Sequence, residues 1–202
     1  MAGSVPLFLH LLMSFLIAFP VAATAFSYAE GLDGDLSGDR LAPTTLVAAQ
    51  GSNTLSGSTV GGDLEYLRIT LPAGTQLGSL VLSSVTSTDD LIFIAMQEGT
   101  TFTVTPATAT EGALLGYAHF GTGPLAGGAT PGNDFLDDMC GAAGAIGCIP
   151  PLGATDYTFW IQQIGGTAFA YTLDFVVVPE PGTFTLLGLG MLGLVGWRRG
   201  RA

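Results

Sequence analysis

The sequence predicts an all-β fold: an antiparallel β-sandwich of jelly-roll-like type, with about eight or nine strands over residues 26–178. Short segments in which apolar and polar residues alternate recur along this region, separated by turns rich in glycine and proline. Glycine accounts for 30 of the 202 residues, about twice its usual share of roughly 7%. No apolar pattern with a helical period exceeds about two turns before residue 179. We expect this domain to be flanked by an N-terminal signal helix and a C-terminal transmembrane helix.

Residues 1–25 have the pattern of a secretory signal peptide. An apolar run over residues 5–19 ends at Pro20, and Ala23-Thr24-Ala25 places small residues at the two positions that signal peptidase reads. The first ten residues contain no lysine or arginine, so the usual basic start is missing. We expect signal peptidase to cleave after Ala25 and the domain to be exported.

Eight segments of the domain are predicted to be strands by their alternation and their flanking turns. They are residues 53–58, 65–71, 80–85, 91–96, 101–104, 114–120, 156–163 and 167–178. Residues 91–96 are nearly all apolar, which predicts a central strand covered on both faces. Gly165-Gly166 is expected to form the hairpin turn between the last two strands. Residues 26–45 and 121–153, which are rich in glycine, are expected to be loops.

The charge of the domain excludes one large class of partner. Of the 16 acidic residues, all but Glu180 lie within residues 26–178, where Arg40 and Arg68 are the only basic residues. Such a surface repels phosphate backbones, so we expect no nucleic-acid binding. It suits divalent cations or neutral glycans instead.

Two cysteines, Cys140 and Cys148, lie in the exported region. An even pair in an oxidising compartment usually forms a disulfide, and this one would close a short loop. A two-thiol metal site is the competing interpretation, but no histidine lies close to it in the sequence.

A glycine-rich stretch near the start of the domain carries the candidate metal ligands Asp33, Asp35 and Asp39. Closely spaced carboxylate oxygens are the ligands that Ca²⁺ prefers, although aspartate and glycine are also what turns favour. The spacing does not fit an EF-hand loop. Ca²⁺ is therefore a candidate cofactor, with solvated turn residues as the alternative.

No catalytic constellation is evident in the sequence, and we expect a protein that is not an enzyme. After export His119 is the only histidine, no lysine occurs anywhere, and no G-x-S-x-G motif is present. A secreted hydrolase that uses His119 with an acidic partner is the alternative. Trp160 lies opposite the predicted core face of its strand, so it is a candidate contact for a sugar ring.

The C-terminal segment, residues 179–202, has three parts in a fixed order. Pro179-Glu180-Pro181 is followed by the uncharged apolar residues 183–197 and then by Arg198, Arg199 and Arg201. Fifteen apolar residues are fewer than the roughly 20 that span a bilayer unaided. The terminal arginines are expected to act as a membrane stop and to hold the C-terminus in the cytoplasm.

These three parts closely resemble the PEP-CTERM sorting signal of Gram-negative bacteria. The resemblance implies that an exosortase, a membrane-embedded sorting protease, recognises the segment and cleaves near Pro179-Glu180-Pro181. Membrane insertion would then be transient: the protein would pass through an inner-membrane intermediate to the cell surface or to an extracellular polysaccharide matrix.

The domain itself more faintly resembles the prepeptidase C-terminal (PPC) β-sandwich family. Residues 64–75 and 157–163 approximate two of its strand motifs, and Tyr171-Thr172-Leu173-Asp174-Phe175 approximates its last strand, but Glu65 stands where that family usually has aspartate. The resemblance implies an accessory module, often associated with calcium or glycans. The sequence thus predicts a non-catalytic structural or binding β-sandwich.

Overall fold

The computed structural model describes residues 24–87, 92–163 and 165–182. Within them lie nine strands and four short helices. The strands are β1 (Ser27–Ala29), β2 (Thr44–Val47), β3 (Gly51–Thr59), β4 (Leu64–Thr70), β5 (Thr75–Val85), β6 (Ile92–Glu98), β7 (Gly116–Phe120), β8 (Asp156–Gln163) and β9 (Phe169–Pro179). The helices are α1 (Glu30–Asp33), η1 (Glu111–Ala113), η2 (Pro124–Ala126) and α2 (Leu136–Cys140).

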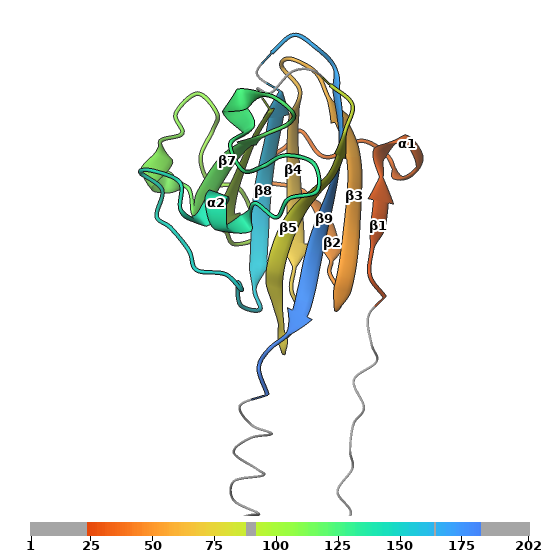
Figure 1. Ribbon diagram of the computed structural model, residues 1–202, viewed down its shortest axis with the longest axis vertical. Coiled ribbons are helices and arrows are strands. Elements are labelled where there is room, and N and C mark those ends of the chain that lie inside the picture. Colours follow the sequence, from red (N-terminus) through yellow and green to blue (C-terminus); the bar gives the residue numbers. More distant parts are fainter. Residues whose placement is uncertain (1–23, 88–91, 164, 183–202) are drawn as a thin grey trace, which may run out of the picture.

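The strands form two sheets, so the all-β prediction is confirmed (Figure 1). One sheet has four strands in the order β1-β3-β9-β5, and the other has five in the order β2-β4-β8-β6-β7. Most side chains between the sheets are apolar, and they alternate along the strands, as the period of a β-strand requires. Phe159 of β8 and Phe175 of β9 meet across this core with ring centroids 5.3 Å apart, and both are fully buried.

Two strand pairs depart from the expected antiparallel pattern. β1 pairs with β3, and β2 with β4, in parallel. Each is a short strand added to the outer side of a longer one, which leaves less of the sheet edge unpaired. The prediction of a loop over residues 26–45 was therefore wrong: this segment holds β1, α1 and the start of β2.

A predicted strand at residues 101–104 was also wrong. These residues lie in the connection between β6 and β7. Phe102 is fully buried there, and its N–H donates to the carbonyl oxygen of Arg40 at 2.9 Å. The apolar residues that suggested a strand belong to the connection over residues 99–115, which we call the covering loop. A loop residue can be buried without a strand partner, so apolar character alone did not identify a strand.

Residues 121–153 carry two short helices but no strand, in agreement with the expected long loop. Residues 132–135 run along the outer edge of β5: Gly132 and Phe135 donate to Leu82 and Leu80 at 2.7 and 2.9 Å. This loop therefore covers an edge that would otherwise be open.

The two predicted processing segments lie outside the described residues: the transmembrane helix at 183–197, and the signal peptide apart from its last two residues. Among the residues that the structure describes, no helix has both the length and the apolar character needed to cross a membrane.

Candidate functional site

The sorting motif begins where the last strand ends. Pro179 is the final residue of β9 and is paired with Thr75 of β5. The Glu180 N–H donates to the carbonyl oxygen of Gly74 at 2.9 Å. Pro179, Glu180 and Pro181 are all exposed. The motif therefore follows the folded domain without a spacer and remains open to a protease.

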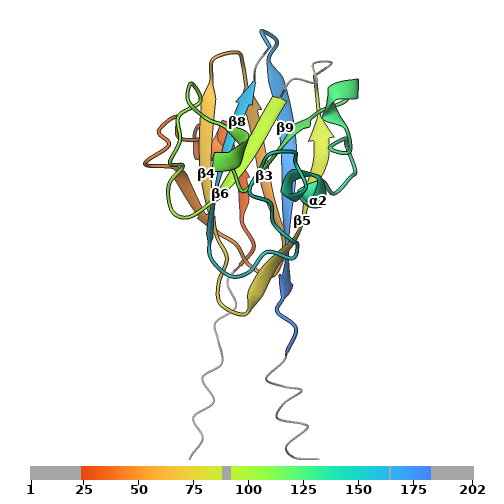
Figure 2. The ribbon, with the colours of Figure 1, turned by 90° about the vertical axis from the view of Figure 1, so that its left-hand side faces the viewer.

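Both ends of the described chain leave the sandwich at one pole. The end of β9 and the chain entering β1 lie together at the lower end in Figure 1 and again in Figure 2. A domain held by a C-terminal segment would thus present the loops of the opposite pole away from that segment. The stop residues Arg198, Arg199 and Arg201 lie outside the described residues.

The structure does not bring Asp33, Asp35 and Asp39 together as a ligand set. Asp33 accepts a hydrogen bond from the Ala29 N–H at 2.8 Å, and Asp39 accepts one from the Leu41 N–H at 2.9 Å. Both carboxylates therefore stabilise local turns, as short acidic side chains commonly do.

Asp35 instead lies beside two glutamates that the sequence analysis did not select. In the described part of the chain, oxygens of Glu30, Asp35 and Glu65 lie within 4.8 Å of one another. Glu30 opens α1, Asp35 follows this helix, and Glu65 comes from β4. We call these three residues the carboxylate cluster.

Glu65 occupies a core-facing position in β4, in phase with the buried Leu67 and Ile69, and is only 1% exposed. The phenol of Tyr171, on β9 of the opposite sheet, donates to Glu65 Oε2 at 2.5 Å. Glu65 Oε1 is buried and has no hydrogen-bond partner in the described structure. The cluster thus contains one carboxylate oxygen that protein groups do not satisfy.

Burial favours the neutral form of the Glu65 carboxyl. Burial raises the pKa of Glu65 from 4.5 to about 9, the hydrogen bond from Tyr171 opposes this, and the charges of Glu30, Asp63 and Asp35 add to it. Burial also raises the pKa of Glu30. The pKa of Asp63 is raised by its burial and then by the charge of Asp35.

Backbone groups hold Glu30 in place. Its Oε2 accepts from the Ser58 N–H at 2.7 Å, and its Oε1 accepts from the Leu36 N–H at 3.2 Å. Gly57 makes the close approach feasible, because a Cβ there would lie 2.7 Å from the Tyr171 hydroxyl and 3.1 Å from Glu30 Cδ. A sequence signal for the cluster did exist: Glu65 interrupts an otherwise apolar core face.

A second candidate site lies on the outer face of the five-stranded sheet. It is a pocket of about 300 Å³ whose lining includes Phe93, Tyr117, His119 and Trp160, and we call it the aromatic pocket. Phe93 and His119 are directly opposite each other on β6 and β7, with ring centroids 5.6 Å apart.

Trp160 lies opposite the core face of β8, as predicted, but it is not an open platform. Its side chain is 5% exposed and packs against Phe102 of the covering loop and against Phe93, with ring centroids 5.8 and 4.9 Å apart. Its Nε1 is buried without a hydrogen-bond partner in the described structure. The half-buried rings that line the pocket are those of Phe93, Tyr117 and His119.

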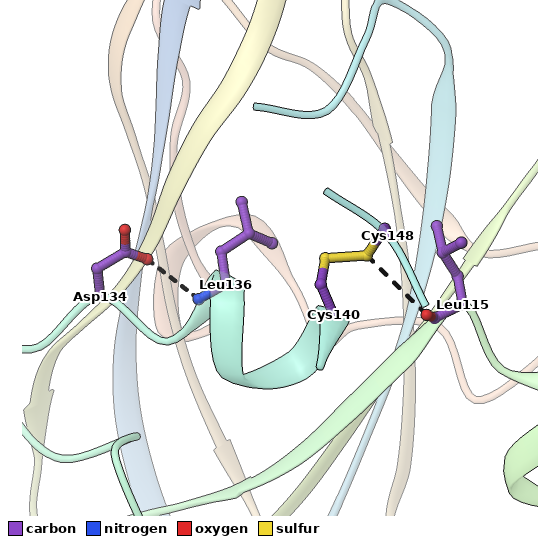
Figure 3. Close-up of a disulfide and its surroundings, with 5 residues drawn as sticks. All are labelled: Leu115, Asp134, Leu136, Cys140 and Cys148. Atoms are coloured by element: carbon purple, nitrogen blue, oxygen red, sulfur yellow. Dashed lines mark hydrogen bonds between the residues drawn. A yellow bond between two sulfur atoms is a disulfide. The ribbon is translucent and has the colours of Figure 1, made fainter. Parts of the chain in front are cut away.

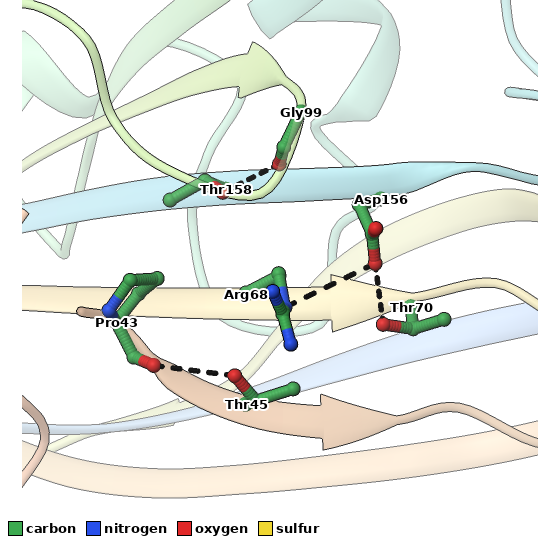
Figure 4. Close-up of polar contacts among 7 residues, drawn as sticks. All are labelled: Pro43, Thr45, Arg68, Thr70, Gly99, Asp156 and Thr158. Carbon is green, nitrogen blue, oxygen red and sulfur yellow. Dashed lines mark hydrogen bonds and ion pairs between the residues drawn. The ribbon is translucent and has the colours of Figure 1, made fainter. Parts of the chain in front are cut away.

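The two basic residues of the domain both have structural contacts. Arg40 donates through Nη1 to the carbonyl oxygens of Phe102 and Thr103 at 3.1 and 3.0 Å. Arg68 Nε lies 4.0 Å from Asp156 Oδ1, which also accepts from Thr70 across β4 and β8 (Figure 4). Neither arginine lines the carboxylate cluster or the aromatic pocket.

Cys140 and Cys148 are joined in a disulfide at the end of α2 (Figure 3). At the start of this helix Asp134 Oδ1 accepts from the N–H groups of Leu136 and Leu80 at 3.1 and 2.9 Å. Cys148 Sγ lies 3.9 Å from the Leu115 carbonyl oxygen. The bridge therefore fixes the long loop beside β5 and β7, and its two sulfurs are bonded to each other, not free thiols.

Similarity to known proteins was found in the C-terminal tail. Residues 177–201 match the model of the PEP-CTERM protein-sorting motif. No curated protein and no solved structure matches the chain. The motif implies a protein that an exosortase processes and sorts to the cell envelope or surface.

Proposed function

We propose that this protein is an exported, non-catalytic β-sandwich that works at the cell surface or in the extracellular polysaccharide matrix. Signal peptidase removes the N-terminal segment, the apolar tail inserts transiently in the inner membrane, and exosortase then cleaves near Pro179-Glu180-Pro181. The observation that carries the proposal is the PEP-CTERM motif at residues 177–201, which begins at the last strand of the domain.

The position of the motif supports a processing step that leaves the fold intact. Every described strand ends at or before Pro179. A cut after this point removes the backbone hydrogen bond between Glu180 and Gly74, and a single such bond contributes only about 1 kcal/mol. The released domain therefore keeps both sheets and the whole core.

Replacing Pro179, Glu180 and Pro181 together by alanine is expected to abolish processing. The wild-type chain should lose its C-terminal segment and appear outside the inner membrane, whereas the variant should retain the full tail and stay with the membrane fraction. Cell fractionation followed by intact-mass measurement, in a bacterium that has exosortase, checks both points.

The matched control replaces two exposed prolines elsewhere, Pro124 and Pro131, by alanine, and should be processed like the wild type. A strain without exosortase should reproduce the membrane retention with the wild-type chain. The sorting proposal fails if the triple variant and the wild type reach the same fraction at the same mass.

The binding role rests on the aromatic pocket. Half-buried aromatic rings offer apolar faces for sugar rings. The negative charge of the domain favours a neutral polysaccharide over an acidic one. We propose that Phe93 and Tyr117 provide the contact surface and that Trp160 supports it from beneath through its packing against Phe93.

A hydrolase is the second candidate function, favoured by one observation: His119 and Glu111 line the same pocket. Two variants distinguish the functions. Native gels that contain dextran or β-glucan should retard the migration of the wild-type protein, and Phe93→Ala should weaken this retardation. His119→Ala should leave the retardation largely unchanged, and neither the wild type nor this variant should hydrolyse the polymers. The exposed Leu125→Ala variant is the control. Polymer cleavage by the wild type that His119→Ala abolishes would replace binding with catalysis.

The strand order supports the jelly-roll-like part of the prediction. Successive strands from β3 to β6 alternate between the two sheets, and β9 returns to lie between β3 and β5. Such crossings belong to Greek-key and jelly-roll sandwiches, an architecture that also serves sugar-binding domains. The strand motifs compared with the PPC family fall on β4, β8 and β9.

A further inference from the structure

The carboxylate cluster is unusual because one of its members is buried in the core. Carboxylates near a surface are common without a ligand, but Glu65 is 1% exposed and faces the space between the sheets. Its Oε2 receives the Tyr171 hydroxyl, whereas Oε1 has no partner in the described structure. A buried polar atom without a partner is destabilising, so this arrangement requires a reason.

Oε1 could be satisfied in two ways. A protonated Oε1 could donate to a carboxylate oxygen of Glu30 or Asp35, since the three residues have oxygens within 4.8 Å of one another, but one proton serves only one of these pairs. An ionised Oε1 would need a cation, and neither arginine of the domain contacts the cluster: Arg40 binds the covering loop, and Arg68 faces Asp156. A cation from solution would satisfy all three carboxylates at once.

We propose that Glu30, Asp35 and Glu65 bind a calcium ion at the junction of α1 with β4 and β9. Ca²⁺ takes its oxygen ligands at 2.3–2.6 Å, so two oxygens on one ion lie up to about 5 Å apart. The oxygens of the cluster lie within 4.8 Å of one another and fit around one ion without a large rearrangement.

Glu30 can serve as a ligand while it keeps its backbone hydrogen bonds. Each Glu30 oxygen accepts one backbone N–H, and a carboxylate oxygen has a second lone pair for a cation. A hollow of about 300 Å³ has Glu30, Gly57 and Tyr171 in its lining but neither Asp35 nor Glu65, so it reaches the cluster at Glu30 alone. Ca²⁺ accepts six to eight ligands in irregular geometry, whereas Mg²⁺ demands a near-ideal octahedron. The mixed set of buried and exposed carboxylates therefore favours Ca²⁺.

Binding would tie the first folded segment of the domain to both sheets. Glu30 and Asp35 flank α1, which follows the three-residue strand β1, while Glu65 connects through Tyr171 to β9. A three-residue strand has few ladder hydrogen bonds of its own. The ion would thus fasten this segment to the sheets and stabilise the domain in proportion to the free Ca²⁺ concentration.

Calorimetric titration of the purified full-length chain in mild detergent, after removal of metal with EDTA, tests the proposal. CaCl₂ should bind with one ion per chain and raise the melting temperature, and MgCl₂ should do so much more weakly. Glu65→Gln preserves the shape and the acceptor for Tyr171 but removes the charge, so it should lower the Ca²⁺ affinity at least ~10-fold. Asp35→Asn, at an exposed position, should also lower it without disturbing the core.

The matched controls are Asp33→Asn and Asp39→Asn, which neutralise carboxylates of the same loop outside the cluster and should bind Ca²⁺ like the wild type. The proposal is overturned if the wild type shows neither heat nor a shift in melting temperature with CaCl₂. It is also overturned if Asp35→Asn binds with wild-type affinity, or if the control variants lose binding. This experiment does not depend on where the cell sends the protein, so it can fail while the sorting proposal stands.

Discussion

Replacing Asn53 by alanine should lower the free energy of unfolding by about 4 kcal/mol or more, because several backbone groups lose their partner together. Asn53 lies on β3 and is fully buried. Its Oδ1 accepts from the Ala49 N–H at 2.9 Å and from the Phe26 N–H at 3.3 Å. Its Nδ2 lies 2.7, 3.1 and 3.2 Å from the carbonyl oxygens of Ala49, Gly51 and Phe175.

One amide side chain thus connects the entry to β1, the turn before β3 and the central strand β9. Alanine would leave buried donors and acceptors unsatisfied, each at a cost of about 1–3 kcal/mol. Water could relieve some of them only by entering the core, so the loss should exceed that of an ordinary surface substitution, which is within about 0.5 kcal/mol.

Urea unfolding followed by tryptophan fluorescence measures this loss, since Trp160 lies in the folded domain. The matched control is Ser52→Ala on the same strand, where an exposed hydroxyl donates to Asp174 Oδ1 at 2.7 Å. Its effect should stay below about 1 kcal/mol. Equal and small effects of the two variants would show that the Asn53 network is not a determinant of stability.

The central strands could be predicted from the sequence because their residues alternate between apolar and polar according to which face of the strand is buried. In β9, Phe169, Tyr171 and Leu173 face the core while their neighbours face outward. The same holds for β8, and the nearly continuous apolar run in β6 matches a strand covered on both faces. A strand buried on one face has apolar residues at every second position, and a strand buried on both faces has a continuous apolar run. Either pattern can be recognised without knowing which strands are its neighbours.

The edges and the covering loops could not be predicted in the same way. β1 and β2 contribute few buried side chains, and their parallel pairing is decided by where the chain returns after α1 and not by their own residues. The loop that buries Phe102 over Trp160 likewise depends on a contact with Arg40, 62 positions away in the sequence. Sequence reasoning consequently assigned Trp160 an open face.

The carboxylate cluster shows a different limit. Counting acidic residues along the chain favoured Asp33, Asp35 and Asp39 because they are close in sequence. The structure brings Asp35 to Glu30 and to Glu65 on a distant strand. The better signal was the mismatch between an ionisable residue and its core-facing position, because such mismatches mark functional sites more often than clusters in turns do.

Without calcium, the domain should become less stable as the pH rises from about 5 to 8, in contrast to the usual behaviour of a domain stabilised by paired carboxylates. The pKa of Glu65 is about 9 in the folded state, against 4.5 for its ordinary value. Between these values the folded chain holds a proton that the unfolded chain has released. The free energy of unfolding therefore falls with rising pH, by up to about 1.4 kcal/mol per unit for one proton.

The groups that face Glu65 act in the same direction. Burial also raises the pKa values of Glu30 and Asp63, Asp35 adds negative charge, and the pKa of Tyr171 is raised well above 10, outside this window. Urea unfolding at several pH values in EDTA should show the decline, and Glu65→Gln, which cannot release a proton, should remove most of it. Since Glu30 and Asp63 remain in this variant, a slope that Glu65→Gln leaves unchanged would assign the effect to them and show that the buried carboxyl is ionised at neutral pH.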